Sequence, residues 1–292
     1  MGWRTVVVNS RAKLELKNNY LVIRGETVTR VFLDEISILM IENTGSAVTV
    51  SLLEALWSRK IAVIFCDKRR FPGAQLIPYY NSHDCSSKVQ SQIKWPKYIK
   101  DLVWSEIIKE KIRNQANLLY ANKLDREGDL LTTYIEEVEV PDVTNREGHA
   151  AKVYFNALFG SAFSRSDNSF INAALNYGYG IILSTITREI VANGYLTQLG
   201  LFHHSVFNEF NFGSDLMEPY RPLVDSIVIN LEAKEDFTHD DKMEILKVLN
   251  MKVKIDTITL TVLNSISYYV RSVFEAIENE DASFLRFYRY EF

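Results

Sequence analysis

The first part of the chain alternates between short apolar runs and polar turn residues. Apolar stretches at 5–8, 14–16, 20–23 and 28–32 are separated by polar segments such as Lys17-Asn18-Asn19, a pattern typical of strands joined as hairpins. Between Thr49 and Arg59 the apolar period changes to that of a helix, and residues 61–65 return to a β-rich run. We therefore expect a β-rich domain over residues 1–83 that contains one short helix.

Beyond Gln90 apolar residues recur every three or four positions, which predicts an all-α domain over residues 84–292. The fold class is therefore α+β, with the β-rich domain first and the larger helical domain second. Gly178 and Gly180 lie inside one predicted helix, where each costs ~1 kcal/mol relative to alanine, so they indicate the close approach of another helix or of a ligand. Predicted helices span 100–122, 170–193, 221–232, 240–248 and 258–278, and predicted loops span 125–129, 136–142 and 208–215.

A charged residue interrupts an apolar helix face at Glu147. If residues 141–160 form one helix, position 147 shares a stripe with Ala151, Tyr154 and Leu158. Burying an unpaired carboxylate costs several kcal/mol or more. Glu147 must therefore be protonated, paired with a base, or bound to a cation.

His203 and Glu218 are the candidates to share such a cation with Glu147. An imidazole with two carboxylates suits Mg²⁺ or Mn²⁺. The spacing alone leaves another interpretation open, in which Glu147 pairs with Arg146 or Lys152 on a solvated face, His203 caps a helix end and Glu218 merely opens a helix.

Composition narrows the class of protein. The 292 residues are 47% hydrophobic and 24% charged, which is normal for a globular protein of two domains. The apolar runs are too short for a membrane helix and the N-terminus has no signal-peptide pattern, so we expect a cytoplasmic protein without a membrane partner. The net charge of −4 requires any nucleic-acid site to be a local basic surface. Cys66 and Cys85 are too few for a disulfide framework, and we expect both to be reduced.

Four short motifs occur in a fixed order along the helical half. They are Asn145-Arg146-Glu147-Gly148-His149-Ala150-Ala151, Ile171-Asn172-Ala173-Ala174-Leu175-Asn176-Tyr177-Gly178-Tyr179, Gly200-Leu201-Phe202-His203 and Asp215-Leu216-Met217-Glu218-Pro219-Tyr220-Arg221-Pro222. Together they resemble the CRISPR-associated integrase family, protein one of the adaptation module, in the branch found in type II systems. The resemblance extends over the whole chain.

The resemblance implies a helical catalytic domain whose metal, Mg²⁺ or Mn²⁺, is held by Glu147, His203 and Glu218. Asp215 matches a supporting acidic position. The second acid is aspartate in many family members and glutamate here, which lengthens one arm of the site. Further residues near the motifs are candidate DNA contacts: Arg146, Asn176, Tyr177 and Arg221.

The resemblance also implies a reaction and a set of partners. The family joins the 3′-hydroxyl ends of a short protospacer DNA to the two strands of the CRISPR leader-repeat by transesterification, in a complex with CRISPR-associated protein two. A homodimer formed through the β-rich domains is implied, and in type II systems the effector nuclease and a ring-forming DNA-end-binding protein take part. Because one phosphodiester replaces another, no ATP is needed, which agrees with the absence of a Gly-rich phosphate loop.

Two alternatives share these residues. Water could replace the 3′-hydroxyl, which would make hydrolysis of branched DNA the main activity, or the chain could be a scaffold that binds DNA ends while another protein performs the chemistry. Lys109, Lys111 and Arg113 are expected on a solvated face or in a phosphate-binding stripe. The aromatic C-terminal residues 284–292 are expected to dock on their own domain, with a partner surface as the alternative.

Overall fold

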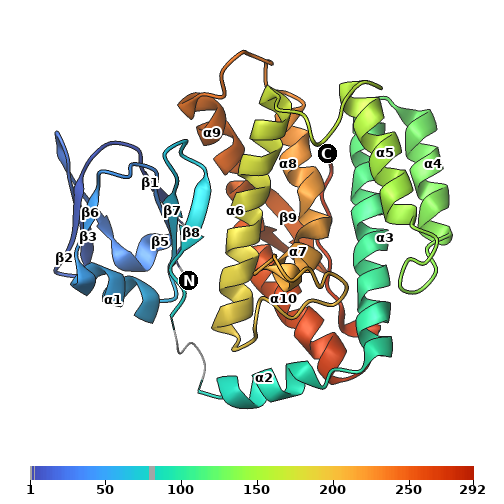
Figure 1. The fold of residues 1–292 in the computed structure, drawn as a ribbon, viewed down its shortest axis with the longest axis horizontal. Helices are drawn as coiled ribbons and strands as arrows, with labels where there is room; N and C mark the ends of the chain where they lie inside the picture. The colour runs from blue at the N-terminus through green and yellow to red at the C-terminus, as the bar shows by residue number, and fades with distance from the viewer. Residues whose placement is uncertain (1, 3, 79–82) are drawn as a thin grey trace. The chain divides into compact units, whose positions relative to one another are not determined.

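A computed structural model describes residues 2, 4–78 and 83–292. The chain divides into two compact units, one formed by Met1–Cys85 with Val191–Gly194 and the other by Ser86–Ile190 with Tyr195–Phe292 (Figure 1). Strands dominate the first unit and helices the second, so the predicted α+β class is confirmed. The predicted end of the β-rich domain, between Pro78 and His83, lies partly outside the described residues. The role of the β-rich domain in dimerisation stays a prediction.

Within the described residues, two four-stranded sheets build the β-rich unit. The first has the order β1-β5-β7-β8 and the second the order β4-β3-β2-β6. The antiparallel pairs β2–β3 and β3–β4 confirm two predicted hairpins, whereas β1, β5 and β7 run parallel, because the chain leaves this sheet between each of them. Their bounds are Arg4–Val8, Lys13–Lys17, Tyr20–Arg24, Val28–Phe32, Ile36–Ile41, Ala47–Val48, Ala62–Cys66 and Pro72–Gln75 for β1 to β8.

The core of this unit lies between the sheets and helix α1 (Val50–Ser58), the predicted short helix. All six residues of β5 are buried, as in a central strand covered on both faces. Leu14, Leu39 and Leu56 belong to one apolar cluster that joins strands of both sheets to α1. Cys66 is buried at the end of β7, and no disulfide forms within the described residues.

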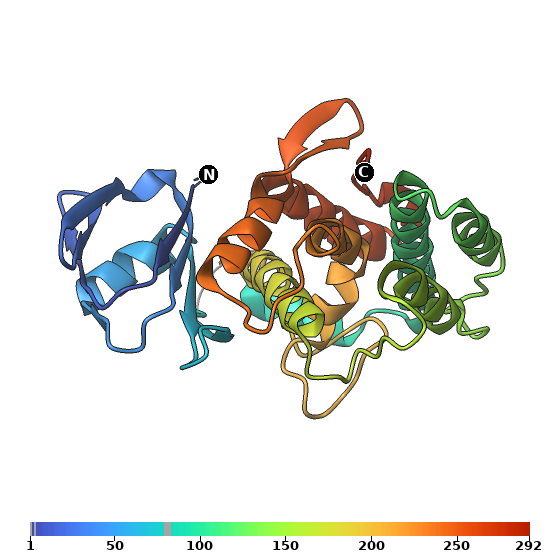
Figure 2. The same cartoon turned by 90° about the horizontal axis from the view of Figure 1, so that it is seen from above.

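Nine helices span the described part of the second unit. Their bounds are Cys85–Ile93, Lys97–Ala121, Asp125–Glu136, Arg146–Phe159, Phe170–Ala192, Asn211–Met217, Arg221–Val228, His239–Leu246 and Val262–Glu278 for α2 to α10. Helix α3 is the longest and packs against α4, α5 and α8. Figure 2 shows α3, α4 and α5 side by side in green. No helix among the described residues is long and apolar enough to cross a membrane.

Glycine permits a close contact between α6 and α8 in this unit. A Cβ atom at Gly178 in α6 would lie 2.3 Å from Cγ1 of Val224 in α8, so only glycine fits there. Of the two predicted causes, helix packing therefore explains Gly178. Gly194 (φ +89°) follows the end of α6, as the Asn193-Gly194 pair indicates.

Several predicted boundaries are wrong. Helix α5 begins at Arg146 rather than near Pro141, because Asn145 adopts a left-handed conformation (φ 52°) that cannot continue a helix. Residues 125–129 and most of 208–215 are helical, in α4 and α7, rather than loops. Residues 258–261 form strand β10 (Ile258–Thr261), which pairs with β9 (Lys252–Ile255) before α10 begins.

The C-terminal residues dock on their own unit, as predicted. Tyr288 is fully buried, and its hydroxyl donates to the carbonyl of Pro219 at 2.7 Å. The backbone of Arg289 pairs with that of Lys254 in β9, and its side chain forms an ion pair with Glu110 in α3. The tail therefore contacts segments directly beside Lys111 and Glu218.

Candidate functional site

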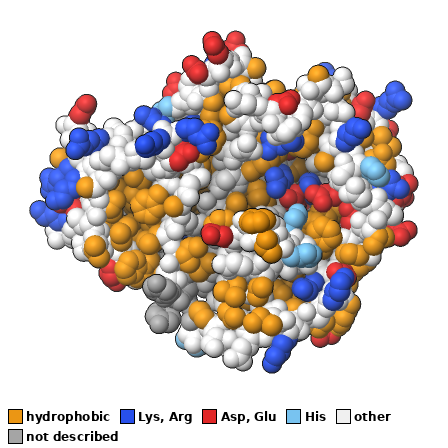
Figure 3. Space-filling view, viewed as in Figure 1, with side chains coloured by type: hydrophobic (Ala, Val, Ile, Leu, Met, Phe, Trp, Pro, Cys, Tyr) orange, Lys and Arg blue, Asp and Glu red, His pale blue; other side chains and the backbone are white. Residues whose placement is uncertain are grey.

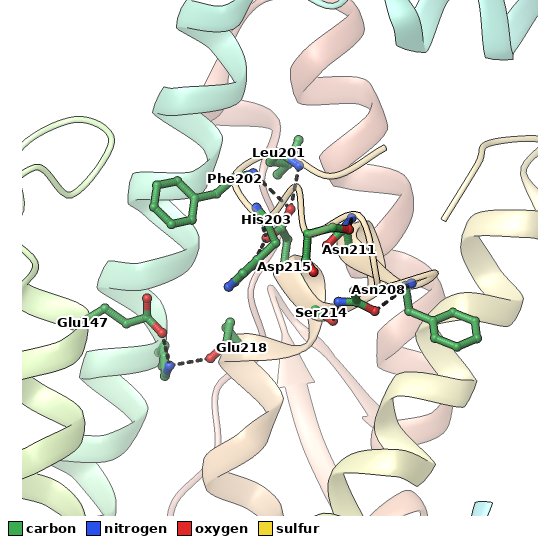
Figure 4. A network of polar contacts seen from close by, with 12 residues as sticks. Glu147, Leu201, Phe202, His203, Asn208, Asn211, Ser214, Asp215 and Glu218 are labelled. Atoms are coloured by element: carbon green, nitrogen blue, oxygen red, sulfur yellow. Dashed lines mark hydrogen bonds and ion pairs between the residues drawn. The ribbon is translucent and has the colours of Figure 1, made fainter. Parts of the chain in front are cut away.

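Three elements of the helical unit bring Glu147, His203 and Glu218 to one place. Glu147 lies in the first turn of α5, His203 in the connection between α6 and α7, and Glu218 opens the 3₁₀ turn Glu218–Tyr220 directly after α7. Figure 4 shows the three side chains turned toward the same space. The structure thus brings together the three residues that the sequence singled out.

Glu147 is placed by the cap of α5. The carboxylate of Asp142 accepts the backbone N–H of Arg146 at 2.8 Å and that of Glu147 at 3.0 Å, so it satisfies two amides that the helix itself leaves unbonded. The Glu147 side chain is 26% exposed. It therefore lies at the edge of the apolar face rather than deep within it.

Asp215 positions His203. Its fully buried carboxylate accepts the backbone N–H groups of Leu201 at 2.6 Å, Phe202 at 3.1 Å and His203 at 3.2 Å. Oδ1 of Asp215 also lies 2.5 Å from Nδ1 of His203. With Nδ1–H donating to this carboxylate, the lone pair of Nε2 is the one available to bind a cation.

An aromatic side chain fixes the same histidine from α3. The ring of Trp104 stacks on Phe202 with centroids 4.7 Å apart and meets the ring of His203 edge-on at 5.5 Å. Trp104 is 1% exposed, so it is a rigid part of the core. The orientation of His203 is therefore determined from both sides.

Lys111 of α3 bridges the two glutamates. Its ammonium lies 2.6 Å from Oε1 of Glu147 and also forms an ion pair with Glu218. The other oxygen of Glu218 accepts from Nε of Arg221 at 2.9 Å. Lys111 and Glu218 are buried, with side chains 8% and 4% exposed. Of the three states predicted for the Glu147 carboxylate, the structure shows pairing with a base. That base is Lys111 rather than Arg146 or Lys152.

The pKa shifts follow from these contacts. Burial opposes the charge on Lys111, but Glu218 and Glu147 outweigh it and raise the lysine pKa. Burial likewise opposes the charge on Glu218, and Arg221 with Lys111 holds its pKa below the usual value. The hydrogen bond that His203 donates to the carboxylate of Asp215 raises the pKa of His203. The neighbouring positive charges thus keep the carboxylate of Glu218 ionised although it is buried.

The donor set has the chemistry of a site for a hard divalent cation, and the ammonium of Lys111 occupies the space between its two carboxylates. Two carboxylates and an imidazole whose other nitrogen is held by a carboxylate are the ligands and outer contact typical of such sites. In the described residues, however, no three His, Cys, Asp or Glu side chains form a ready metal-binding group. The ammonium of Lys111 lies between the two glutamates. This position already attracts positive charge.

The four residues predicted to contact DNA differ in how far their side chains are exposed. Arg221 is 27% exposed, Asn176 is exposed, and Arg146 stacks over Tyr134 at 5.2 Å while pairing with Glu137. Tyr177 is fully buried, so the predicted DNA contact has no surface through which to act.

Lys111 is the functional candidate that the sequence analysis missed. The sequence predicts that Lys111 lies with Lys109 and Arg113 on a solvated face or in a phosphate-binding stripe, and this prediction is wrong because Lys111 is 6% exposed. Its position four residues after Ile107 and three after Ile108, on the same helix face, is a weak signal. Figure 3 shows basic, acidic and histidine side chains gathered on the face between the positions of α3 and α6.

Solved structures share this fold. A casposase bound to integration product aligns over 96% of this chain and 93% of its own, with a TM-score of 0.78 and 18% identity. A CAS1 protein from Thermotoga maritima aligns over 94% and 97% with a TM-score of 0.75 and 17% identity. A Cas6-RT-Cas1–Cas2 complex aligns over 97% of this chain with a TM-score of 0.73 and 16% identity, and this chain spans 36% of that longer one.

Sequence comparison gives the family. A CRISPR-associated endonuclease Cas1 of Neisseria meningitidis is 34% identical over 98% of this chain and 96% of its own length. A CRISPR-associated endonuclease Cas1 of Francisella tularensis subsp. novicida is 31% identical over 75% of each chain. The family profile of CRISPR associated protein Cas1 matches residues 5–259. This chain therefore belongs to the CRISPR associated protein Cas1 family.

Proposed function

We propose that this chain is a metal-dependent DNA integrase and endonuclease of CRISPR adaptation. The observation that carries the proposal is the convergence of Glu147 and Glu218 on the ammonium of Lys111, with His203 close enough for its charge to interact with both glutamates. Relatives named as Cas1 endonucleases and a similar structure of a casposase with its integration product support the same chemistry.

Mg²⁺ or Mn²⁺ held by Glu147, His203 and Glu218 would polarise a phosphodiester and neutralise the charge that accumulates on its oxygens. Neighbouring residues orient and charge these three side chains. Asp215 fixes the ring of His203 and the proton on its Nδ1, while Lys111 and Arg221 keep Glu218 ionised despite its burial. Both glutamates therefore face a positive charge, the ammonium of Lys111, which a bound cation would replace.

The proposed reaction exchanges one phosphodiester for another. The 3′-hydroxyl oxygen of the protospacer forms a bond to a phosphorus of the leader-repeat, and the bond from that phosphorus to the neighbouring 3′ oxygen breaks. The attacking hydroxyl loses a proton and the departing oxygen gains one, so no ATP is consumed. When water attacks instead, the same site hydrolyses DNA, which is the activity that the word endonuclease in the names of its relatives describes.

DNA and CRISPR-associated protein two are the proposed partners. The similar complex that contains Cas1 and Cas2 supports the second of these. A homodimer through the β-rich unit, and participation of the type II effector nuclease and a ring-forming DNA-end-binding protein, follow from the family resemblance.

A joining assay tests the proposal. The purified chain with its CRISPR-associated protein two is incubated with Mn²⁺, a short duplex with free 3′ hydroxyls and a plasmid that carries the repeat. Joined product is expected, and Glu147→Ala and His203→Ala should abolish it while the circular dichroism spectrum stays unchanged. A predominance of nicked plasmid would indicate hydrolysis as the main activity. Unchanged joining by both variants would contradict the proposed site and favour the scaffold interpretation.

A further inference from the structure

The connection between α5 and α6 carries an arginine into the region of Glu218. The guanidinium of Arg165 donates to the side-chain oxygen of Asn172 and to that of Asn176, the latter at 2.7 Å. Asn172 in turn donates to the backbone carbonyls of Ser164 and Asp167, both at 2.8 Å. The loop and the start of α6 thus hold Arg165 in one orientation.

Arg165 shares an aromatic support with Arg221, the partner of Glu218. Its guanidinium carbon lies 5.4 Å from the ring centroid of Tyr179, and that of Arg221 lies 4.6 Å from the same centroid. A contact of Arg165 with Phe155 at 5.9 Å completes the packing. Two like charges are therefore held close together against one ring, an arrangement that repels unless an anion is near.

The positive charge of this pair is only partly matched by carboxylates. Arg165 forms no ion pair among the described residues, and both of its hydrogen-bond acceptors are neutral amides. Arg221 gives only Nε to Glu218, so within the described residues its two terminal nitrogens have no acceptor. The buried carboxylate of Asp225 lies nearby, but its two oxygens accept from the hydroxyls of Tyr154 and Tyr179. Burial and the charge of Arg221 lower the pKa of Arg165.

We propose that Arg165 and Arg221 bind a phosphate of the DNA strand beside Glu218, with the exposed amide of Asn176 at the edge of this site. The inference rests on the proposed function and adds where the strand runs, along the α5–α6 connection and the first turns of α6. Planar guanidinium groups match phosphate oxygens and are rarely left without an anion when they are held rigidly. The ligand is a backbone phosphodiester rather than a base, because the donors are charged and carry no pattern specific to one base.

DNA binding measured without metal tests this inference separately from catalysis. The probe is a duplex with single-stranded 3′ ends, and fluorescence anisotropy in EDTA gives its affinity at several salt concentrations. Arg165→Gln should weaken binding about tenfold and reduce the slope of log affinity against log salt by ~0.7 to ~0.9. Arg271→Gln, on the exposed side of α10, is the matched control and should change neither quantity.

Arg165→Gln could weaken binding by loosening the loop that Arg165 holds. A change made in the DNA rather than in the protein distinguishes that effect from the loss of a phosphate contact. A single neutral methylphosphonate is moved along the 3′ strand. One position should weaken binding by wild type about as much as Arg165→Gln does, and the same position should have no effect in that variant. The inference would be overturned if no methylphosphonate weakened DNA binding by wild type. It would also be overturned if every methylphosphonate weakened binding by wild type and by Arg165→Gln equally.

The outcomes separate the two proposals. A wild-type protein that joins DNA while Arg165→Gln binds with unchanged affinity and salt slope refutes the phosphate site alone. A wild-type protein that shows the expected methylphosphonate pattern but never joins or cuts DNA refutes the proposed function and supports the phosphate site.

Discussion

Replacing Lys111 with methionine removes the positive charge that bridges Glu147 and Glu218. Methionine has a similar length and fills most of the same space, so the change is mainly electrostatic. The two carboxylates would then face each other in a region where Glu218 is 4% exposed. Arg221 would still neutralise one oxygen of Glu218.

The expected loss of stability follows from this burial. Removing one partner of a buried ion pair costs about 3–5 kcal/mol. The 26% exposure of Glu147 and the remaining contact of Glu218 with Arg221 place the value at the lower end, about 3 kcal/mol. For a helical unit of this size that corresponds to a fall in melting temperature of roughly 6–12 °C.

Thermal unfolding in EDTA measures the effect, with Lys109→Met as the matched control. Lys109 lies two residues away on α3 in a half-exposed pair with Glu106, and its loss should cost less than about 1 kcal/mol. Saturating Mn²⁺ should restore about 2.7 kcal/mol to Lys111→Met at a hundred times the dissociation constant. A loss as small as that of the control would refute the bridging role, and a melting temperature insensitive to Mn²⁺ would refute the cation site.

Three further substitutions have distinct outcomes. Asp215→Asn should weaken Mn²⁺ binding about 10- to 100-fold in calorimetric titration, because His203 loses its orienting carboxylate; unchanged affinity would contradict that role. Tyr288→Phe removes a buried hydrogen bond to Pro219, beside Glu218, and should slow joining about tenfold with an unchanged KM for DNA; a changed KM alone would argue against positioning. Burial raises the pKa of Asp225 to about 6, so its protonated form favours the folded state. Stability relative to Asp225→Asn should therefore fall by about 2 kcal/mol as the pH rises from 4 to 7 in urea unfolding, and a flat difference would refute the shift.

Much of the fold could be predicted because periodicity and burial agree there. The short apolar runs of β2 to β4 between polar turns, the helical period of α1 and the apolar face of α10 can all be read from the sequence. The prediction failed where backbone conformation decides. Asn145 starts α5 late through a positive φ, and Asp256 (φ 51°) turns β9 into β10 within a stretch rich enough in apolar residues to resemble a helix.

The site could be predicted in part, for a similar reason. Residue type and ordered motifs point to Glu147, His203 and Glu218, whereas their convergence follows from packing that no local pattern contains. Lys111 escaped notice because α3 buries polar residues such as Glu110 and Asn114 alongside its apolar ones. Only tertiary contacts distinguish a buried lysine of this kind from a solvated one.

The most direct measurement of the central claim is anomalous diffraction from a crystal soaked in Mn²⁺. One peak is expected at coordinating distance from Glu147, His203 and Glu218, with the ammonium of Lys111 moved away from the two carboxylates. A crystal that binds Mn²⁺ elsewhere, or nowhere, while Lys111 still bridges Glu147 and Glu218 would contradict the account.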